Sequence, residues 1–217
     1  MKRLLRKIYR KLYKFFNYFP FNNQYKLRGT KLINLGKPLY RCKFVCRGTG
    51  NQIILHPEGI IRNTTFYING NNNVIEIGRD SSINQGDLYI EDDGNRIEIG
   101  EHTRMCGKIH LACTESRTIK IGNDCLFSSE IVFRTGDSHS LVDMEGNRIN
   151  PAADITLGDH IWVGYRVLIN KGVSIAPNNM IGTGAIVTKK FDQSNTVIAG
   201  VPAKVVKTNT DWVTQRI

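Results

Sequence analysis

A single histidine lies in the segment RTGDSHSLVDMEGNRINPAAD (134–154), among residues that could act with it in proton transfer. His139 stands between Asp137 and Asp143, and Arg134 opens the segment. An imidazole has a pKa near neutrality, so it can take a proton from a hydroxyl group and release it later in the same reaction. The segment therefore predicts a site for acid–base chemistry with His139 as the base. The alternative is an exposed loop histidine without a function.

A repeat of 22 residues leads up to this segment, in GNQIILHPEGII (50–61), NNVIEIGRDSSI (72–83), GNRIEIGEHTRM (94–105) and SRTIKIGNDCLF (116–127). Isoleucine recurs at the same place in each copy, at Ile53, Ile75, Ile97 and Ile119. A further apolar row is predicted at the same interval, at Tyr67, Tyr89, Leu111 and Phe133. Clusters such as NGNNN (69–73) and EDDGN (91–95) are typical of turns.

A shorter repeat of six residues follows the segment, between Ile155 and Thr188. Its aliphatic positions are Leu157, Val163, Ile169, Ile175, Ile181 and Val187. Neither a helical period of 3.6 nor the alternation of a single strand produces this spacing. It suits a parallel β-helix, in which each six-residue unit forms one side of a coil and stacked coils bury a continuous core.

The two repeats are separated by an insertion. The copy ITLGDHIWV (155–163) begins 36 residues after Ile119, whereas the earlier copies are 22 residues apart. The additional residues cannot remain within a regular coil, so they must protrude as a loop that carries His139. Loops on rigid scaffolds often carry the chemistry of a protein.

Four motifs in order resemble one family: TGDSHS (135–140), GDHIWVG (158–164), the six-residue units and IAGVPAKVVK (198–207). The chain resembles hexapeptide-repeat acyltransferases, and among them the O-acetyltransferases of capsule and lipopolysaccharide sugars. The resemblance is strongest over residues 134–207. It implies an all-β fold, a left-handed parallel β-helix, which assembles as a homotrimer with acetyl-CoA in the groove between subunits and with no metal.

The resemblance also assigns roles to residues. It makes His139 the catalytic base, and Arg134, Asp137, Asp143 and Trp162 bind or orient the acceptor. Either aspartate could orient the imidazole. His160, beside Trp162, is expected to face outward without a role. Contacts to acetyl-CoA are implied for Gly164, Tyr165, Gly182, Thr183, Thr188, Lys189, Lys204 and Lys207.

The expected activity is acetyl transfer to a sugar hydroxyl of a surface polysaccharide (capsule, O-antigen or exopolysaccharide) or its precursor. Two alternatives remain open: an N-acetyltransferase for an amino sugar nucleotide, and a non-catalytic solenoid that binds a partner. A zinc-dependent carbonic anhydrase on the same scaffold would need three converging histidines. The five histidines of this chain lack the close HxxxxH pair of that family.

The first twenty residues differ from the rest of the chain. They hold seven Lys and Arg and no acid, whereas the net charge of the whole chain is +11. Apolar and basic residues occupy opposite halves of a predicted amphipathic helix, which we expect to lie on the anionic inner leaflet of a membrane. The alternative is that this helix packs on the body or on a neighbouring subunit. Because the basic surplus is local, nucleic acid is not an expected partner.

The domain organisation follows from these patterns: the helix (1–20), a connector and first edge of the solenoid (21–48), the β-helix (49–200) with its loop (134–154), and a C-terminal tail (201–217), for which a small capping helix is one possibility. Five cysteines without CxxC pairs, and no cleavable signal, favour a reduced cytoplasmic setting. Cys125 occupies an inward position and is predicted to fill the core.

Overall fold

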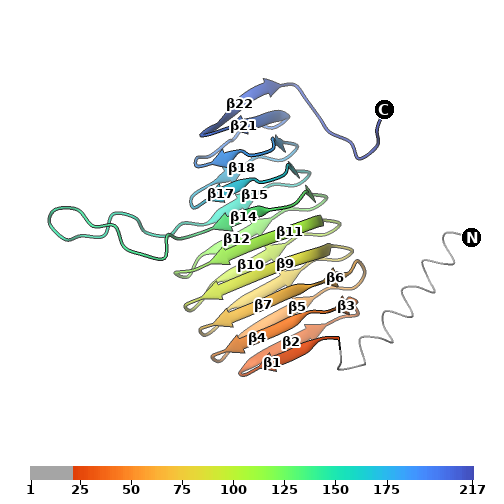
Figure 1. Ribbon diagram of the computed structural model, residues 1–217, viewed down its shortest axis with the longest axis vertical. Coiled ribbons are helices and arrows are strands. Elements are labelled where there is room, and N and C mark those ends of the chain that lie inside the picture. The colour runs from red at the N-terminus through yellow and green to blue at the C-terminus, as the bar shows by residue number, and fades with distance from the viewer. Residues whose placement is uncertain (1–21) are drawn as a thin grey trace, which may run out of the picture.

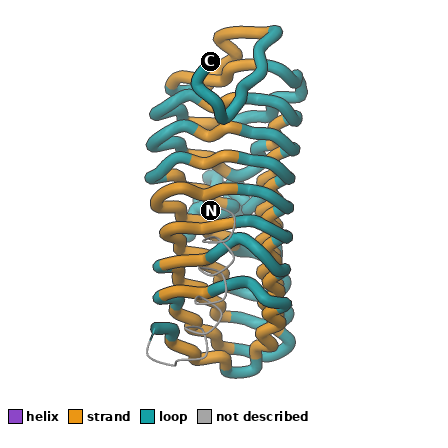
Figure 2. The backbone as a smooth tube through the Cα atoms, turned by 90° about the vertical axis from the view of Figure 1, so that its right-hand side faces the viewer, coloured by secondary structure: helices purple, strands orange, loops and turns teal. Residues whose placement is uncertain are grey.

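The computed structural model describes residues 22–217. The predicted N-terminal helix (1–20) and its membrane contact lie outside this range. The described chain winds into a rod of stacked coils, with β1 at one end and β22 at the other (Figure 1). Figure 2 shows that equivalent strands lie above one another from coil to coil. The predicted all-β, left-handed parallel β-helix is confirmed.

Each coil contributes a strand to each of three faces. Face 1 contains β1 (Gln24–Leu27), β4 (Lys43–Arg47), β7 (Thr64–Asn69), the second halves of β9 (Ser82–Glu91) and β11 (Arg104–Cys113), β14 (Ile131–Arg134), β17 (Leu168–Asn170) and β20 (Ile186–Val187). Face 2 contains β2 (Thr30–Asn34), β5 (Asn51–Leu55), β8 (Val74–Ile77), β10 (Arg96–Ile99), β12 (Thr118–Ile121), β15 (Ile155–Leu157) and β18 (Ser174–Ile175). Face 3 contains β3 (Leu39–Tyr40), β6 (Ile61–Arg62), the first halves of β9 and β11, β13 (Leu126–Phe127), β16 (Trp162–Val163), β19 (Met180–Ile181) and β21 (Thr196–Gly200).

The predicted isoleucine row runs through the core of face 2. Ile53, Ile75, Ile97, Ile119 and Ile155 pair in register from β5 to β15, and each is fully buried. Burial of such a side chain contributes about 1.5–3 kcal/mol. Because each residue packs on its equivalents in neighbouring coils, the stack is stable only as a whole.

The corner between faces 1 and 2 carries the predicted turns and is held by an asparagine ladder. Asn51, Asn73 and Asn95 are buried. The backbone N–H of Asn73 donates to Asn51 Oδ1 at 2.9 Å, and that of Asn95 donates to Asn73 Oδ1 at 2.7 Å. Each side chain thus satisfies a backbone group of the next coil, which would otherwise be buried without a partner.

One predicted row is wrong. The pairing between β9 and β11 shifts by one residue between Met105 and Lys108. As a result Leu111 pairs with Leu88, both of them in the core, whereas Tyr89 pairs with Ala112. Tyr67 and Tyr89 therefore form an outward row on face 1, and Leu111 and Phe133 belong to the inward row beside it.

The ends of the solenoid also differ from expectation. Within residues 21–48, expected to be a connector and the first edge of the solenoid, residues 24–40 form a first coil of β1, β2 and β3. Its strand β1 is largely exposed, so it carries no apolar period in the sequence. At the other end, the tail begins with β22 (Ala203–Thr208), which pairs antiparallel with β21. The sequence allows a small capping helix over the last residues (208–217), but they form no helix.

Cys125 is buried and fills the core as predicted, and burial raises the pKa of its thiol to about 11. Between residues 22 and 217, no helix has the length and apolar character needed to cross a bilayer.

Candidate active site

The inserted loop leaves face 1 after β14 and returns to face 2 at β15, and it projects sideways from the rod as predicted (Figure 1). Its outer part is a hairpin, in which Val142 bridges Arg148 and the N–H of Ile149 donates to Leu141 O at 2.8 Å. At its tip, Asp143 Oδ1 accepts hydrogen bonds from the backbone N–H of Asn147 (2.8 Å) and from that of Glu145. These hydrogen bonds, that of Asn147 first, lower the pKa of Asp143. Its carboxylate therefore shapes the tip of the loop.

His139 lies exposed on the inner part of the loop. Asn150, on the returning part of the loop, braces this segment through hydrogen bonds to His139 and to residues on both sides of it. Its side-chain amide donates to the carbonyl oxygen of His139 (2.9 Å) and to Asp137 Oδ2 (2.9 Å), and its Oδ1 accepts from the N–H of Leu141 (2.7 Å). These contacts fix the backbone around His139 without using its imidazole.

Lys171 ties this brace to the solenoid. It follows β17 on the next coil, and its ammonium group binds Asp137 Oδ2 and the carbonyl oxygen of Asn150 (3.0 Å). The hydrogen bond from Lys171 is the main reason why the pKa of Asp137 lies below its ordinary value. The described contacts of both aspartates, Asp137 and Asp143, thus hold the loop in shape.

A second anchor joins the loop to the coil below it. Arg148 donates two hydrogen bonds to the carboxylate of Glu115, at 2.7 and 2.8 Å. A two-point pair of this kind fixes orientation as well as position. Arg134, the last residue of β14, is exposed, and its Nη2 donates to Ser138 Oγ at 3.0 Å.

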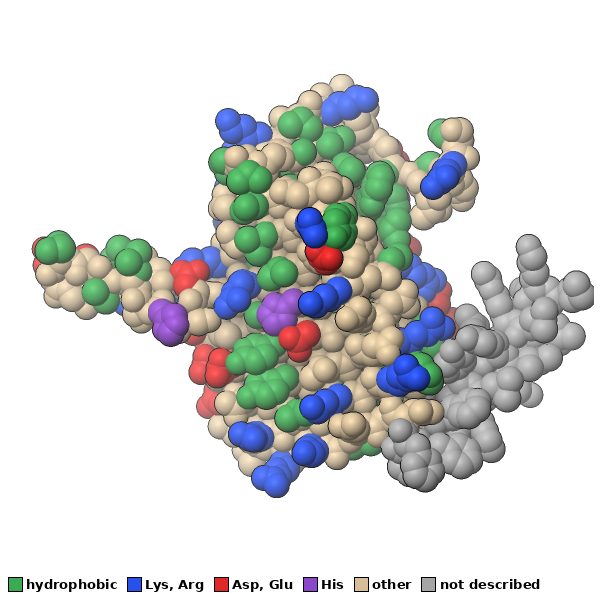
Figure 3. Space-filling view, viewed as in Figure 1, with side chains coloured by type: hydrophobic (Ala, Val, Ile, Leu, Met, Phe, Trp, Pro, Cys, Tyr) green, Lys and Arg blue, Asp and Glu red, His purple; other side chains and the backbone are tan. Residues whose placement is uncertain are grey.

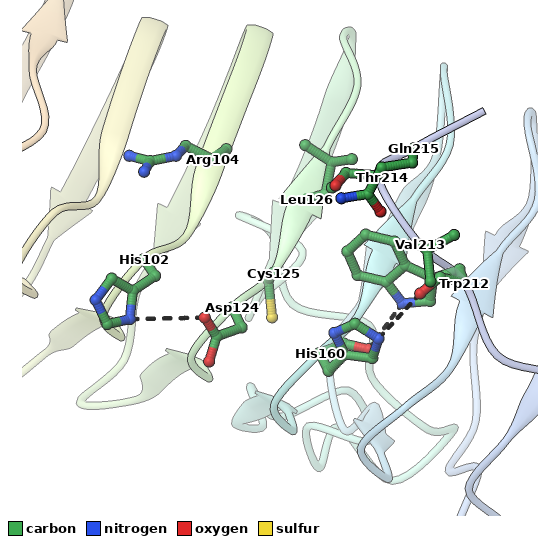
Figure 4. A pocket seen from close by; sticks show the side chains of 10 residues that line it. All are labelled: His102, Arg104, Asp124, Cys125, Leu126, His160, Trp212, Val213, Thr214 and Gln215. Atoms are coloured by element: carbon green, nitrogen blue, oxygen red, sulfur yellow. Dashed lines mark hydrogen bonds and ion pairs between the residues drawn. The ribbon is translucent and has the colours of Figure 1, made fainter. Parts of the chain in front are cut away.

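Trp162 projects outward from β16 on face 3 and is 36% exposed. Trp212 of the C-terminal tail packs against it with ring centroids 6.1 Å apart. Trp212 also stacks on His160 at 4.2 Å and donates from its indole N–H to His160 O at 3.0 Å. Figure 4 shows these two rings facing each other at one side of a pocket of about 510 Å³. His160 is therefore a docking point for the tail, not a residue without a role.

The structure does not bring His139 and Trp162 onto one surface of a single chain. The loop leaves the rod where faces 1 and 2 meet, whereas Trp162 lies on face 3. The family motifs predict that both residues belong to one site. The fold permits this only if face 3 of another copy lies beside the loop.

The residues expected to contact acetyl-CoA fall into separate groups. Gly164 and Gly182 stack on the corner between faces 3 and 1, where a Cβ at Gly164 would meet the backbone nitrogen of Thr183 at 2.7 Å. Tyr165 and Thr183 follow them on the same corner. Lys204 pairs with Ala199, so it lies near this corner, whereas Lys207 pairs with Val197 at the other end of face 3.

Thr188 and Lys189 lie at the opposite edge of face 1, directly after β20. The ammonium group of Lys189 lies 5.5 Å from the ring centre of Phe191. Of the residues expected to contact acetyl-CoA, only Gly164, Tyr165, Gly182, Thr183 and Lys204 thus share a corner.

Comparisons with solved structures identify close relatives of the whole fold. The crystal structure of NeuO, a polysialic acid-specific acetyltransferase, superposes with a TM-score of 0.80 and 30% identity over 89% of this chain and 88% of that one. The polysialic acid O-acetyltransferase OatWY superposes with a TM-score of 0.67 and 29% identity, over 80% of this chain and 92% of that one.

Among curated sequences, a polysialic acid O-acetyltransferase of Escherichia coli O1:K1 is 35% identical over 100 residues, which make up 46% of this chain and 32% of that protein. The aligned segment thus spans about a third of that relative's length. No family model matches the chain.

Proposed function

The chain belongs to the hexapeptide-repeat O-acetyltransferases, and from this membership we propose that it transfers an acetyl group from acetyl-CoA to a sugar hydroxyl of a surface polysaccharide or its precursor. The observation that carries the proposal is the match along almost the whole rod to a polysialic acid-specific acetyltransferase. The braced loop that presents His139 supports it, because it supplies the base that such a transfer needs.

His139 acts as the base. It takes the proton of the sugar hydroxyl while the hydroxyl oxygen forms a bond to the acetyl carbon, and it gives this proton to the sulfur as the carbon–sulfur bond breaks. Its exposed position leaves the imidazole accessible to an acceptor, and the near-neutral pKa of histidine suits both transfers. Backbone N–H groups would stabilise the oxyanion formed between the two steps.

We propose a homotrimer in which the loop of one subunit lies against face 3 of the next, so that residues of two chains form each active site. The separation of His139 and Trp162 on one chain supports this arrangement. The outer loop also exposes apolar side chains that a neighbour could cover, at Leu141, Val142, Met144 and Ile149. Trp162 would then line the acceptor site opposite His139.

The donor is proposed to lie along the corner of Gly164 and Gly182. The exposed Lys204 beside them supports this, because its ammonium group suits the phosphates of the nucleotide. Lys189 and Lys207 lie away from this corner, so we propose that they contact the donor from a neighbouring subunit.

We further propose that residues 1–20 bind an anionic membrane surface, which would place the enzyme at the inner face of the cytoplasmic membrane. The basic and aromatic composition of this segment supports the proposal. Sedimentation with anionic vesicles, with and without residues 1–20, tests it. Equal binding of both forms would contradict it.

The activity is tested by incubating the protein with acetyl-CoA and a panel of glycans, including polysialic acid, while free thiol is measured. Glycan-dependent thiol release, with an acetyl group found on the glycan by mass spectrometry, is expected. A trimer that releases thiol with none of the glycans would contradict the proposed function.

A further inference from the structure

A pocket of about 200 Å³ lies on face 1 at the base of the loop. It is lined by residues of three consecutive coils, among them Tyr89, Ala112 and Arg134, and by Gly136 and Ser138 of the loop. Ser138 directly precedes His139, so the pocket adjoins the candidate base. Figure 3 shows this face, with hydrophobic side chains gathered below and above the point where the loop leaves the rod.

The pocket exists because one outward row contains a gap. Tyr67, Tyr89, Ala112 and Arg134 pair in register along the outside of face 1. Tyr67 and Tyr89 stack with ring centroids 4.8 Å apart. Ala112 carries a single methyl group at the next level. It therefore forms a floor between the ring of Tyr89 on one side and the guanidinium of Arg134 on the other.

The register shift in β11 creates this gap. A strict period of 22 would place Leu111 beside Tyr89, but the shift between Met105 and Lys108 turns Leu111 into the core. Gly107 permits the shift, because a Cβ there would meet Ser129 Cβ at 2.3 Å. The hydroxyl of Ser129 accepts the N–H of Lys108 at 2.9 Å and stabilises the bulge.

The walls of the pocket combine an aromatic ring with polar side chains that can form hydrogen bonds. The hydroxyl of Tyr89 donates to Glu91 Oε2 at 2.8 Å, and His110 Nδ1 lies 2.8 Å from Asp87 Oδ2. Within residues 22–217, Arg134 forms no ion pair with a carboxylate, so most of its N–H groups can bind a ligand. A pyranose ring has an apolar face and a rim of hydroxyl groups, and it matches such a mixed lining.

We propose that this pocket binds one pyranose residue of the acceptor glycan, next to the residue whose hydroxyl reacts at His139. The proposal rests on the proposed function, which it deepens by locating the acceptor. The sugar lies on the floor formed by Ala112 against Tyr89, and Arg134 and Glu91 bind its polar groups. The acceptor must contain at least two linked sugars, because one sugar occupies the pocket while its neighbour reacts at His139.

The test fills the pocket. A strict period of 22 residues would place a leucine beside Tyr89, and Ala112→Leu restores one there. Its side chain projects into the space of the ligand. The matched control is Thr65→Leu, which adds an outward leucine on β7 of the same face at a residue that does not line the pocket. With sialic acid tetramers or maltotetraose as acceptor, we expect Ala112→Leu to raise the KM for the glycan about tenfold or more, because the added side chain occupies the site. The KM for acetyl-CoA and the thermal unfolding midpoint should stay at wild-type values.

A binding measurement separates this proposal from the proposed function. In His139→Ala protein, saturation-transfer NMR detects oligosaccharide binding whether or not acetyl transfer occurs. Loss of the signal on adding Ala112→Leu, but not Thr65→Leu, supports the subsite even if no glycan releases thiol. The proposal is overturned if neither oligosaccharide binds, if Ala112→Leu binds like the control, or if only the KM for acetyl-CoA changes.

Discussion

The side-chain amide of Asn150 holds the carbonyl oxygen of His139 through a hydrogen bond of 2.9 Å, across the two strands of the projecting loop. The same amide binds Asp137, which is bound by Lys171 of the next coil. A chain of polar contacts thus connects the backbone of His139 to the rigid solenoid. The loop is therefore a fixed arm that presents one imidazole at a set distance from the rod.

His139→Ala should abolish transfer while leaving assembly and donor binding in place. Loss of a general base typically costs about 10²–10⁴ in rate. Thiol release gives kcat, and sedimentation velocity and acetyl-CoA calorimetry give assembly and binding. His56→Ala, which removes a histidine paired with Glu76 far from the loop, is the control and should keep its rate. Near wild-type turnover of His139→Ala would show that another group is the base.

Asn150→Ala should lower kcat about tenfold to a hundredfold with little change in the KM for acetyl-CoA, because a small displacement of His139 lengthens the proton-transfer path. Asn147→Ala removes an amide contact to Asp143 at the loop tip and serves as the control, with a smaller effect expected. If the two variants lose activity equally, the loop requires general rigidity and Asn150 has no particular positioning role.

Lys171→Met should raise the pKa of Asp137 toward its ordinary value, while the hydrogen bond from Asn150 still lowers it. Lys171 now holds this pKa low, so the contact stabilises the loop above the ordinary pKa of aspartate and is lost only as the pH falls through the lowered value. NMR titration of the Asp137 carboxyl carbon measures the shift directly. An unchanged titration midpoint in Lys171→Met would mean that Asn150 alone lowers the pKa.

Trp212→Ala should free the C-terminal tail and expose Trp162. The chain contains only these two tryptophans, so the fluorescence of the variant comes from Trp162 alone. We expect its emission to move to longer wavelength than in Trp212→Phe, which keeps an aromatic ring against Trp162 and His160. Loss of a mostly buried tryptophan in the tail should cost about 1–3 kcal/mol of stability, less than in a core. Identical emission in the two variants would contradict the packing.

The buried side chain of Lys37 should make the free energy of unfolding depend on pH. It is buried, with its ammonium group donating to Glu58 O, Gly78 O and Ser81 O at 2.7–3.1 Å. Burial lowers its pKa from 10.5 to about 8. Between these values the unfolded chain binds the proton more strongly than the folded one. Stability should therefore rise with pH across this window, by up to about 3 kcal/mol.

Urea unfolding at pH 7 and pH 10, compared between wild type and Lys37→Met, isolates this contribution, because other titrating groups cancel in the difference. The wild type should gain more stability than Lys37→Met. An equal gain would mean that the three carbonyl oxygens keep the ammonium charged throughout.

Much of the fold could be predicted because the repeat appears in the sequence as a regular spacing of apolar residues. The isoleucines from Ile53 to Ile155 identify the stacked coils, and the change in spacing before Ile155 locates the loop. The shift in β11 could not be predicted, because Cys106–Gly107 has the composition of an ordinary turn and the following Leu111 fits the period in the wrong row. The close approach of Ser129 on the next coil, which leaves no room for a Cβ at position 107, exists only once the coils are stacked.

The candidate site was predictable to the extent that it is local. His139 and Trp162 each lie within a family motif. Their placement on different faces, however, depends on how the coils wind. The brace from Asn150 and the contact of Lys171 with Asp137 join residues separated by 11 and 34 positions. No period or motif connects them, so they appear only once the loop is folded.

The antiparallel pairing of β22 with β21 closes the end of face 3. An open parallel end would present unpaired N–H and C=O groups on which another coil, from the same chain or from a second one, could continue to grow. The reversal at Gly200–Ala203 replaces that template with a strand of opposite direction, rich in exposed charge at Lys204 and Lys207. On this face the end of the rod is thereby protected against fibre-like, end-to-end polymerisation, a hazard inherent in any structure built by repeating one parallel strand on the next.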